Sequence, residues 1–137
     1  MESAEHFTPF AEMIRALAAV QPEHVALVQD GRSVSYAELN AAMDRVAAAL
    51  QRDEVAPGEA IAICAGTSIE YAIVFCGALR AGVAVAPIAP SSTPESIVGM
   101  IADSGAHIFF ADADVSAALD GVRGDIAAAW VALDGAA

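Results

Sequence analysis

Residues 59–90 decide the fold, and they read EAIAICAGTSIEYAIVFCGALRAGVAVAPIAP. The run over 59–64 is short and apolar and contains β-branched isoleucines, which predicts a buried strand. Apolar residues then fall on nearly every face of a helix expected over 69–79, and a second apolar strand is expected over 83–88. Two apolar strands joined by a helix are typical of a right-handed βαβ unit in a parallel sheet with both faces covered.

The ends of these elements carry residues suited to starting or stopping them. The hydroxyl of Thr67 or Ser68 can cap the helix that follows the turn. Gly82 is suited to the left-handed position after the helix, because glycine has no Cβ to clash there. Pro87 and Pro90 are expected to stop the second strand, since proline lacks a backbone N–H.

An amphipathic helix and a hairpin are expected before this unit. Thr8-Pro9 favours the start of a helix, with the threonine as its cap and the proline at its first position. Five apolar residues recur at helical spacing and predict one buried face: Phe10, Met13, Ile14, Leu17 and Val20. Asp30-Gly31 separates alternating segments over 25–29 and 32–36 and so predicts a β-hairpin.

The remaining elements alternate between helix and strand. Ser35 and Glu38 fit a capping box that opens a helix running to about Arg52. Further helices are expected over 95–103 and 115–119, and further strands over 107–111 and 129–133. The expected fold class is therefore α/β, a mostly parallel sheet with helices on both faces and an N-terminal β-hairpin, and the 137 residues make one domain or part of one.

The charge of the chain excludes several classes of partner. It holds 6 basic residues against 18 acidic ones, for a formal net charge of −12. No basic cluster could neutralise phosphates, so neither nucleic-acid binding nor attraction to an anionic membrane is expected.

The longest apolar span carries Arg80 and two prolines and does not predict a membrane helix. Cys64 and Cys76 fall in a buried strand and a buried helix, and we expect inert thiols in a reducing cytoplasm.

The sequence holds little recognisable catalytic chemistry. Its three histidines lack metal-ligand spacing, and it contains neither a nucleophile elbow nor a phosphate-loop motif. It also has no lysine, which excludes a lysine clamp on phosphate. No catalytic and no metal-binding residue is therefore predicted. Asp103, Asp112 and Asp114 are expected to be solvated carboxylates near the ends of elements.

Two helix starts could bind an anion, because the first amides of a helix have no partner within it. The turn over 65–68 is one, although an ordinary connection with a capped helix is the favoured interpretation. Ser91, Ser92 and Thr93 form a similar hydroxyl-rich start at the carboxyl end of the next strand, where α/β sheets place ligands. A plain cap is favoured here too, and Ser91 and Ser92 are the candidate cofactor-binding residues.

Four motifs in a fixed order resemble the opening of the adenylate-forming superfamily, which includes acyl- and aryl-CoA ligases, firefly luciferase and the adenylation domains of nonribosomal peptide synthetases. They are SYAEL at 35–39, PGEAIAI at 57–63, GALRAGVAVAP at 77–87 and DSGA at 103–106. The resemblance covers residues 10–133 and implies the first α/β subdomain of that fold. It also implies that residues 1–137 lack the rest of the large domain and a C-terminal domain.

The resemblance implies that a carboxylate attacks ATP to give an acyl-adenylate, and that the acyl group then passes to a thiol such as that of coenzyme A. The family's lysine-bearing phosphate loop, magnesium ligand, ribose-binding aspartate and catalytic lysine are expected on polypeptide after Ala137. ATP, magnesium and coenzyme A are therefore expected for the whole enzyme and no cofactor for this segment, which should be structural and inactive alone.

The first expectation is the N-terminal segment of an acyl- or aryl-CoA ligase. A peptide-synthetase adenylation domain is the alternative, because DSGA is also common there. A stand-alone interaction module without catalysis is the third. A segment of a longer enzyme should bind the remainder of that enzyme, or self-associate, through exposed apolar surface.

Two positions depart from the family pattern. Ala89-Pro90-Ser91 stands where many CoA ligases have an Asn-Pro pair that is often followed by a basic residue. Glu54 stands where a helix-ending glycine is usual. A non-glycine residue there costs about 1 kcal/mol if its φ is positive.

Overall fold

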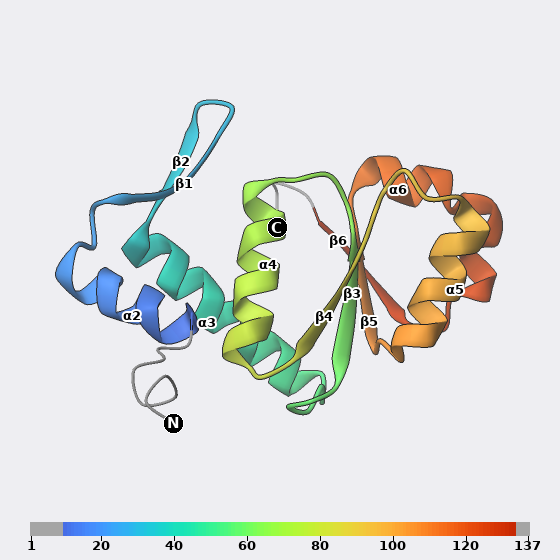
Figure 1. Cartoon of the computed structure of the whole chain (residues 1–137), viewed down its shortest axis with the longest axis horizontal. Helices are drawn as coiled ribbons and strands as arrows, with labels where there is room; N and C mark the ends of the chain where they lie inside the picture. Colours follow the sequence, from blue (N-terminus) through green and yellow to red (C-terminus); the bar gives the residue numbers. More distant parts are fainter. Residues whose placement is uncertain (1–9, 134–137) are drawn as a thin grey trace, which may run out of the picture.

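A computed structural model describes residues 10–133 of the chain (Figure 1). Its elements follow in this order: α2 (Phe10–Val20), β1 (Val25–Gln29), β2 (Arg32–Ser35), α3 (Tyr36–Arg52), β3 (Ala60–Cys64), α4 (Ile69–Arg80), β4 (Ala84–Ile88), α5 (Pro94–Ser104), β5 (Ile108–Ala111), α6 (Ala113–Ala118), the 3₁₀-helix η1 (Asp120–Asp125) and β6 (Ala129–Ala132). Each helix and strand expected from the sequence is present, with ends displaced by one or two residues.

Four parallel strands form the central sheet, in the order β4-β3-β5-β6. Helices α3 and α4 cover one face, and α5 and α6 cover the other (Figure 1). The α/β class with both sheet faces covered is therefore confirmed. The chain leaves β3 toward β4 and then returns to place β5 on the opposite side of β3, so the direction of winding changes between β3 and β5.

The core lies on both sides of β3, whose residues alternate between two apolar clusters. Ile61 and Ile63 pack with Val74 and Phe110 beneath α3 and α4. The opposite face of the same strand, with Ala62 and Cys64, packs with the elements on the α5 side. Since a strand buried on both faces needs apolar residues at every position, the uninterrupted apolar run of β3 is explained.

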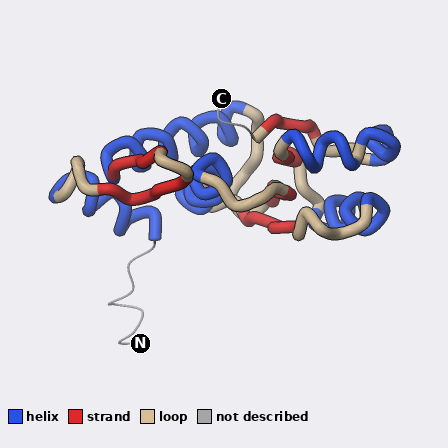
Figure 2. The backbone as a smooth tube through the Cα atoms, turned by 90° about the horizontal axis from the view of Figure 1, so that it is seen from above, coloured by secondary structure: helices blue, strands red, loops and turns tan. Residues whose placement is uncertain are grey.

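The hairpin β1–β2 forms a separate two-stranded antiparallel sheet that lies apart from the central sheet (Figure 2). Its turn places Asp30 at φ 48° and Gly31 at φ 82°, the left-handed pair expected of an Asp-Gly hairpin turn. The second strand ends at Ser35, one residue earlier than expected, because Ser35 is already the N-cap of α3. The capping box is confirmed: Glu38 N donates to Ser35 Oγ at 3.1 Å, and Ser35 N donates to Glu38 Oε1 at 2.9 Å.

The buried face of helix α2 differs from the one expected from the sequence. Ala11 and Ile14 are its buried residues, whereas Phe10, Met13 and Val20 are exposed. The reason is that α2 packs against α3 through Ala11 and Ile14, which cluster with Leu39 and Met43, so the rest of its apolar stripe lies outside this contact. The expected cap at residues 8–9 lies outside the described residues.

Pro87 also differs from expectation, because it lies within β4 rather than after it. The strand tolerates proline because β4 is an edge strand, with β3 as its neighbour in the central sheet. Glu54 does adopt a positive φ of 65°, so the departure from the usual glycine has the expected backbone strain.

Arg80 of α4 connects this helix with α2 and α3. Its side chain is 7% exposed, and its guanidinium donates to the carbonyl of Ala11 at 2.8 Å and to that of Asn40 at 3.0 Å. It also lies 2.9 Å from Asp44 Oδ1. A single buried side chain on α4 therefore fixes the positions of α2 and α3.

Candidate functional site at the carboxyl edge of the sheet

The carboxyl edge of the parallel sheet is the candidate site, because open α/β sheets bind ligands outside this edge where the winding reverses. Segment 65–68 follows β3, segment 89–93 follows β4, and Asp112 follows β5. The reversal between β3 and β5 places the crevice between Gly66 and Asp112.

Protein atoms already occupy that crevice. Gly66 N–H donates to Asp112 Oδ2 at 2.9 Å, and Val115 N–H donates to Asp112 Oδ1 at 2.9 Å. Asp112 is thus the N-cap of α6 and is half-buried, which corrects the expectation of a solvated carboxylate. An incoming phosphate would meet this negative charge instead of a free amide.

The start of α4 is satisfied in the same way. Tyr71 N–H donates to Ser68 Oγ at 3.0 Å, so Ser68 is the helix cap. Ile69 N–H donates to Gln29 Oε1 at 3.1 Å, and Gln29 Nε2 donates to Thr67 O at 3.2 Å. The hairpin therefore supplies a second capping side chain from 40 residues away. These contacts favour an ordinary connection over an anion site.

Arg32 extends this link between hairpin and helix. Its two terminal nitrogens lie 2.8 Å and 3.0 Å from the two carboxylate oxygens of Glu70, in a bidentate pair. The hydrogen bond with Arg32 lowers the pKa of Glu70, while partial burial opposes the shift. The sequence does not predict this pair, since the two residues are 38 positions apart.

Ser91 and Ser92 lie in the loop between β4 and α5. The cap of α5 is their neighbour Thr93, whose Oγ1 accepts from Ser96 N–H at 3.2 Å. Ser91 is exposed and Ser92 is half-buried, and Ser92 N–H donates to Ala89 O at 3.0 Å. The two hydroxyls are thus free of a capping role, and cofactor binding by them stays a prediction.

A hollow of about 230 Å³ lies beside this loop. It is lined by Gly66, Pro90, Asp112, Asp114, Val115 and Ala118. Two of these side chains are carboxylates and none is basic, so the hollow has the wrong charge for ATP phosphates. The residues that line this hollow do not fit a nucleoside triphosphate.

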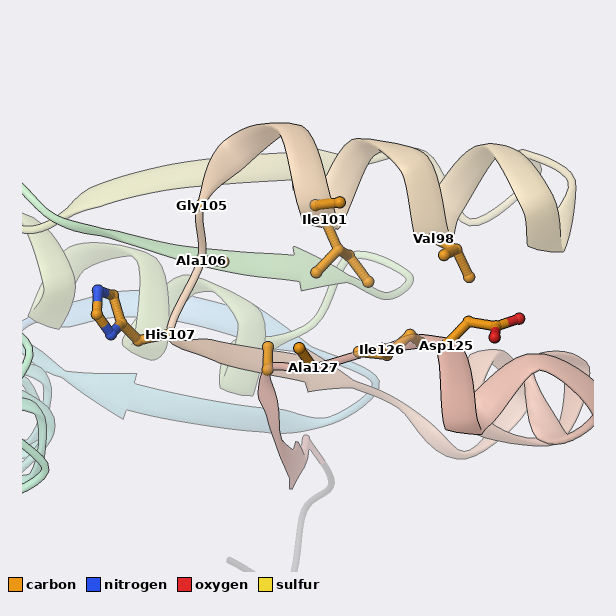
Figure 3. Close-up of a pocket in the computed structure, with 10 residues that line it drawn as sticks. Val98, Ile101, Gly105, Ala106, His107, Asp125, Ile126 and Ala127 are labelled. Carbon is orange, nitrogen blue, oxygen red and sulfur yellow. The ribbon is translucent and has the colours of Figure 1, made fainter.

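Another hollow, of about 500 Å³, lies at the opposite, amino edge of β5 and β6 (Figure 3). His107 lies at one end and Asp125 at the other, and Ile101 and Val98 point into it from α5 (Figure 3). The His107 imidazole is already 3.3 Å from Glu59 Oε2. The hollow lies at the edge of the sheet away from the crevice.

Neither thiol in residues 10–133 is activated as a nucleophile. Burial raises the pKa of Cys64 to about 11, so its thiol stays protonated, and burial also raises the pKa of Cys76. Cys76 is half-buried, less than expected. No group of three His, Cys, Asp or Glu side chains in this range could hold a metal ion. The described residues also contain no helix long and apolar enough to cross a membrane.

A four-stranded parallel sheet with helices on both faces, preceded by an antiparallel hairpin, matches the N-terminal subdomain of adenylate-forming enzymes. The family model described as "AMP-binding enzyme" matches residues 14–134. The chain therefore belongs to the AMP-binding enzyme family, and the resemblance stated from its motifs is confirmed.

Individual relatives include peptide synthetases and acyl-CoA synthetases. Gramicidin S synthase 2 of Brevibacillus brevis is 34% identical over 94 residues, which are 69% of this chain and 2% of that protein. The fatty acyl CoA synthetase of Mycobacterium tuberculosis has a TM-score of 0.81 at 25% identity, covering 89% of this chain and 26% of that one. The nonribosomal peptide synthetase FmoA3 has a TM-score of 0.77 at 22% identity, covering 93% and 14%. The chain thus spans a small part of the length of each.

Proposed function

We propose that this chain is the N-terminal scaffold of a longer ATP-dependent enzyme, here called the parent enzyme, which activates a carboxylate as an acyl-adenylate. One observation carries the scaffold role. At the switch between β3 and β5, the amides that could bind phosphate are bonded to Asp112, Ser68 and Gln29 of the chain itself. Nucleotide and magnesium would then be bound by other parts of the parent enzyme.

We propose further that the acyl group passes to a thiol, and that the parent enzyme is a peptide-synthetase adenylation domain. The support is the sequence comparison, in which gramicidin S synthase 2 is 34% identical over 69% of this chain. The FmoA3 structure holds α-methyl-L-serine-AMP, an aminoacyl adenylate, so an amino acid is the substrate class that this proposal gives the parent.

An acyl- or aryl-CoA ligase is the second candidate, with coenzyme A as the acceptor. Its support is structural, because the fatty acyl CoA synthetase superposes with a higher TM-score, 0.81, than the peptide synthetase, 0.77. For either parent we propose a cytoplasmic location, in line with the two free cysteines of this chain.

ATP–pyrophosphate exchange tests these proposals. The parent enzyme should exchange label with one or a few amino acids and not with fatty or aryl acids; the reverse preference would establish the ligase. The 137-residue chain alone should show no exchange with any acid. Turnover by the chain alone would contradict the scaffold role, and a parent protein inactive with every carboxylate would contradict the proposed adenylation.

A further inference from the structure

The hollow of about 500 Å³ at the amino edge of the sheet has the size of a small-molecule site, since such sites measure about 300–1,000 Å³. Helix α5 forms one wall, and the segments that lead into β5 and β6, residues 105–107 and 125–128, form the other (Figure 3). The described chain ends after β6 at the opposite edge, where Leu133 N–H donates to Ala111 O at 2.9 Å. The polypeptide that follows therefore begins at the edge away from this hollow.

The middle of the hollow is apolar and is held by the core. Val98 and Ile101 point into it from α5, and Ile126 lies on the opposite wall (Figure 3). Ile101 and Ile126 are also buried members of the apolar cluster on the α5 side of the sheet. Close packing therefore fixes the shape of the hollow. An aliphatic chain is the part of a ligand that such walls favour.

Asp125 gives one end of the hollow a negative charge. Its carboxylate is exposed and has no ion pair within residues 10–133. The arginine nearest to it in sequence, Arg123, lies over the ring of Trp130, with its guanidinium carbon 4.2 Å from the ring centre. The Asp125 carboxylate is therefore available to a cation.

The other end of the hollow also carries an acceptor. His107 Nε2 lies 3.3 Å from Glu59 Oε2, so this nitrogen can donate its proton to the carboxylate. The ring then has Nδ1 left to accept a hydrogen bond from a ligand. None of the residues that line the hollow is a lysine or an arginine, so a ligand carboxylate or phosphate would meet negative charge without a basic partner.

We propose that this hollow binds a linear aliphatic polyamine, with one ammonium group on Asp125, a second on His107 and the methylene chain between them. Charge complementarity is the argument for this ligand, because acceptors lie at both ends of the hollow and apolar side chains lie between them. The net charge of −12 also attracts polycations to the chain. The inference does not depend on the proposed function.

The hollow at the carboxyl edge is also acidic and provides an internal comparison. It is smaller, about 230 Å³, and is lined by the carboxylates of Asp112 and Asp114. Asp112 already accepts from two backbone amides. We therefore expect a polyamine to prefer the amino-edge hollow.

Calorimetric titration of the 137-residue chain with spermidine tests the site. We expect saturable binding of one spermidine per chain. Butylamine has an aliphatic chain but a single ammonium group, so it should bind at least about tenfold more weakly, because one end of the hollow stays unpaired. Succinate, which carries the opposite charge, should not bind. Equal affinities for spermidine and butylamine, or no saturable binding of spermidine, would overturn the proposal.

Charge removal locates the site. D125N should weaken spermidine binding at least about tenfold, whereas D114N, which removes the same charge from the carboxyl-edge hollow, should change it less than about twofold. H107F keeps an aromatic ring but removes the acceptor, so it should weaken the binding of spermidine and not that of butylamine. Equal weakening by D125N and D114N would indicate diffuse attraction to the acidic surface and would overturn the site.

A lysine placed inside the hollow gives a second test. Val98 points into the hollow at the end where Asp125 lies (Figure 3), so the ammonium group of V98K can pair with that carboxylate in place of the ligand. V98K should therefore abolish spermidine binding. G99K is the matched control, because it adds the same charge to the next position of α5, where a Cβ meets nothing within 4 Å. Circular dichroism checks that both variants keep the fold, and equal spermidine affinities in the two would contradict the proposed position of the ligand.

Discussion

The Asp112 carboxylate and the Gly66 amide are joined by a hydrogen bond of 2.9 Å across 46 residues of sequence. The bond connects the loop after β3 with the cap of α6 after β5. It therefore closes the crevice in which many α/β proteins bind an anionic ligand. The chain uses its own carboxylate where such a protein would bind a phosphate.

Replacing Asp112 should destabilise the fold. D112A removes the acceptor of two backbone amides, Gly66 and Val115, and should lower the free energy of unfolding by about 1–3 kcal/mol. Urea denaturation measures the change. D114A is the control, because Asp114 lies exposed in the first turn of the same helix. Equal losses in the two variants would contradict the bridging role.

Gly77 should not accept a side chain. A Cβ there would lie 2.4 Å from Val46 Cβ, where α3 and α4 cross. We expect G77A to lower the free energy of unfolding by about 1–3 kcal/mol, and V46A in the same chain to recover part of it. G99A is a matched control on α5: a Cβ there meets nothing within 4 Å, so it should stabilise by up to about 1 kcal/mol. A G77A variant as stable as G99A would rule out the close crossing.

Glu54 offers a stabilising substitution. Its φ of 65° strains any residue with a Cβ, so E54G should raise the free energy of unfolding by about 1 kcal/mol. Thermal and urea unfolding should both report the gain. A48G, in the interior of α3, should instead lower the free energy of unfolding by about 1 kcal/mol, because glycine is unfavourable within a helix. The prediction fails if E54G is the less stable of the two.

The Arg32–Glu70 pair should make stability depend on pH. Arg32 lowers the pKa of folded Glu70 below its ordinary value of 4.5, so the unfolded chain binds the proton more readily. The contribution is therefore fully present above 4.5 and is lost as pH falls through the lower pKa of the folded state. Urea midpoints measured across this range should fall less steeply in E70Q and in R32M, and by a similar amount in both. An unchanged pH profile in either variant would show that the pair is not maintained in solution.

The layer order and most element ends could be predicted from sequence because local signals agree with the fold. The apolar run of β3, the Asp-Gly turn, the Ser35 capping box and Gly82 each specify a local geometry, and Gly82 adopts a φ of 75°. The motif order then predicts how these units join. Pro87 was expected to stop its strand because edge and central strands cannot be distinguished before the strand order is known.

The contacts at the candidate site could not be predicted in this way. Gln29, Arg32 and Glu70 meet because the hairpin folds back onto the start of α4, and no local pattern relates residues 40 positions apart. Phe10 and Met13 are exposed for a similar reason, since helical spacing identifies an apolar stripe but not the width of the surface that covers it. Arg80 was expected only to interrupt an apolar span, yet it is a buried link between helices.

Strand β3 is made first among the strands of the sheet but occupies an inner position, between β4 and β5. During synthesis, Ile61 and Ile63 have no neighbouring strand on the β5 side until residues 108–111 have been made. A nascent chain released before that point would expose one side of its most apolar strand and become a substrate for chaperones or aggregation. Shortened versions intended for expression should therefore retain β5.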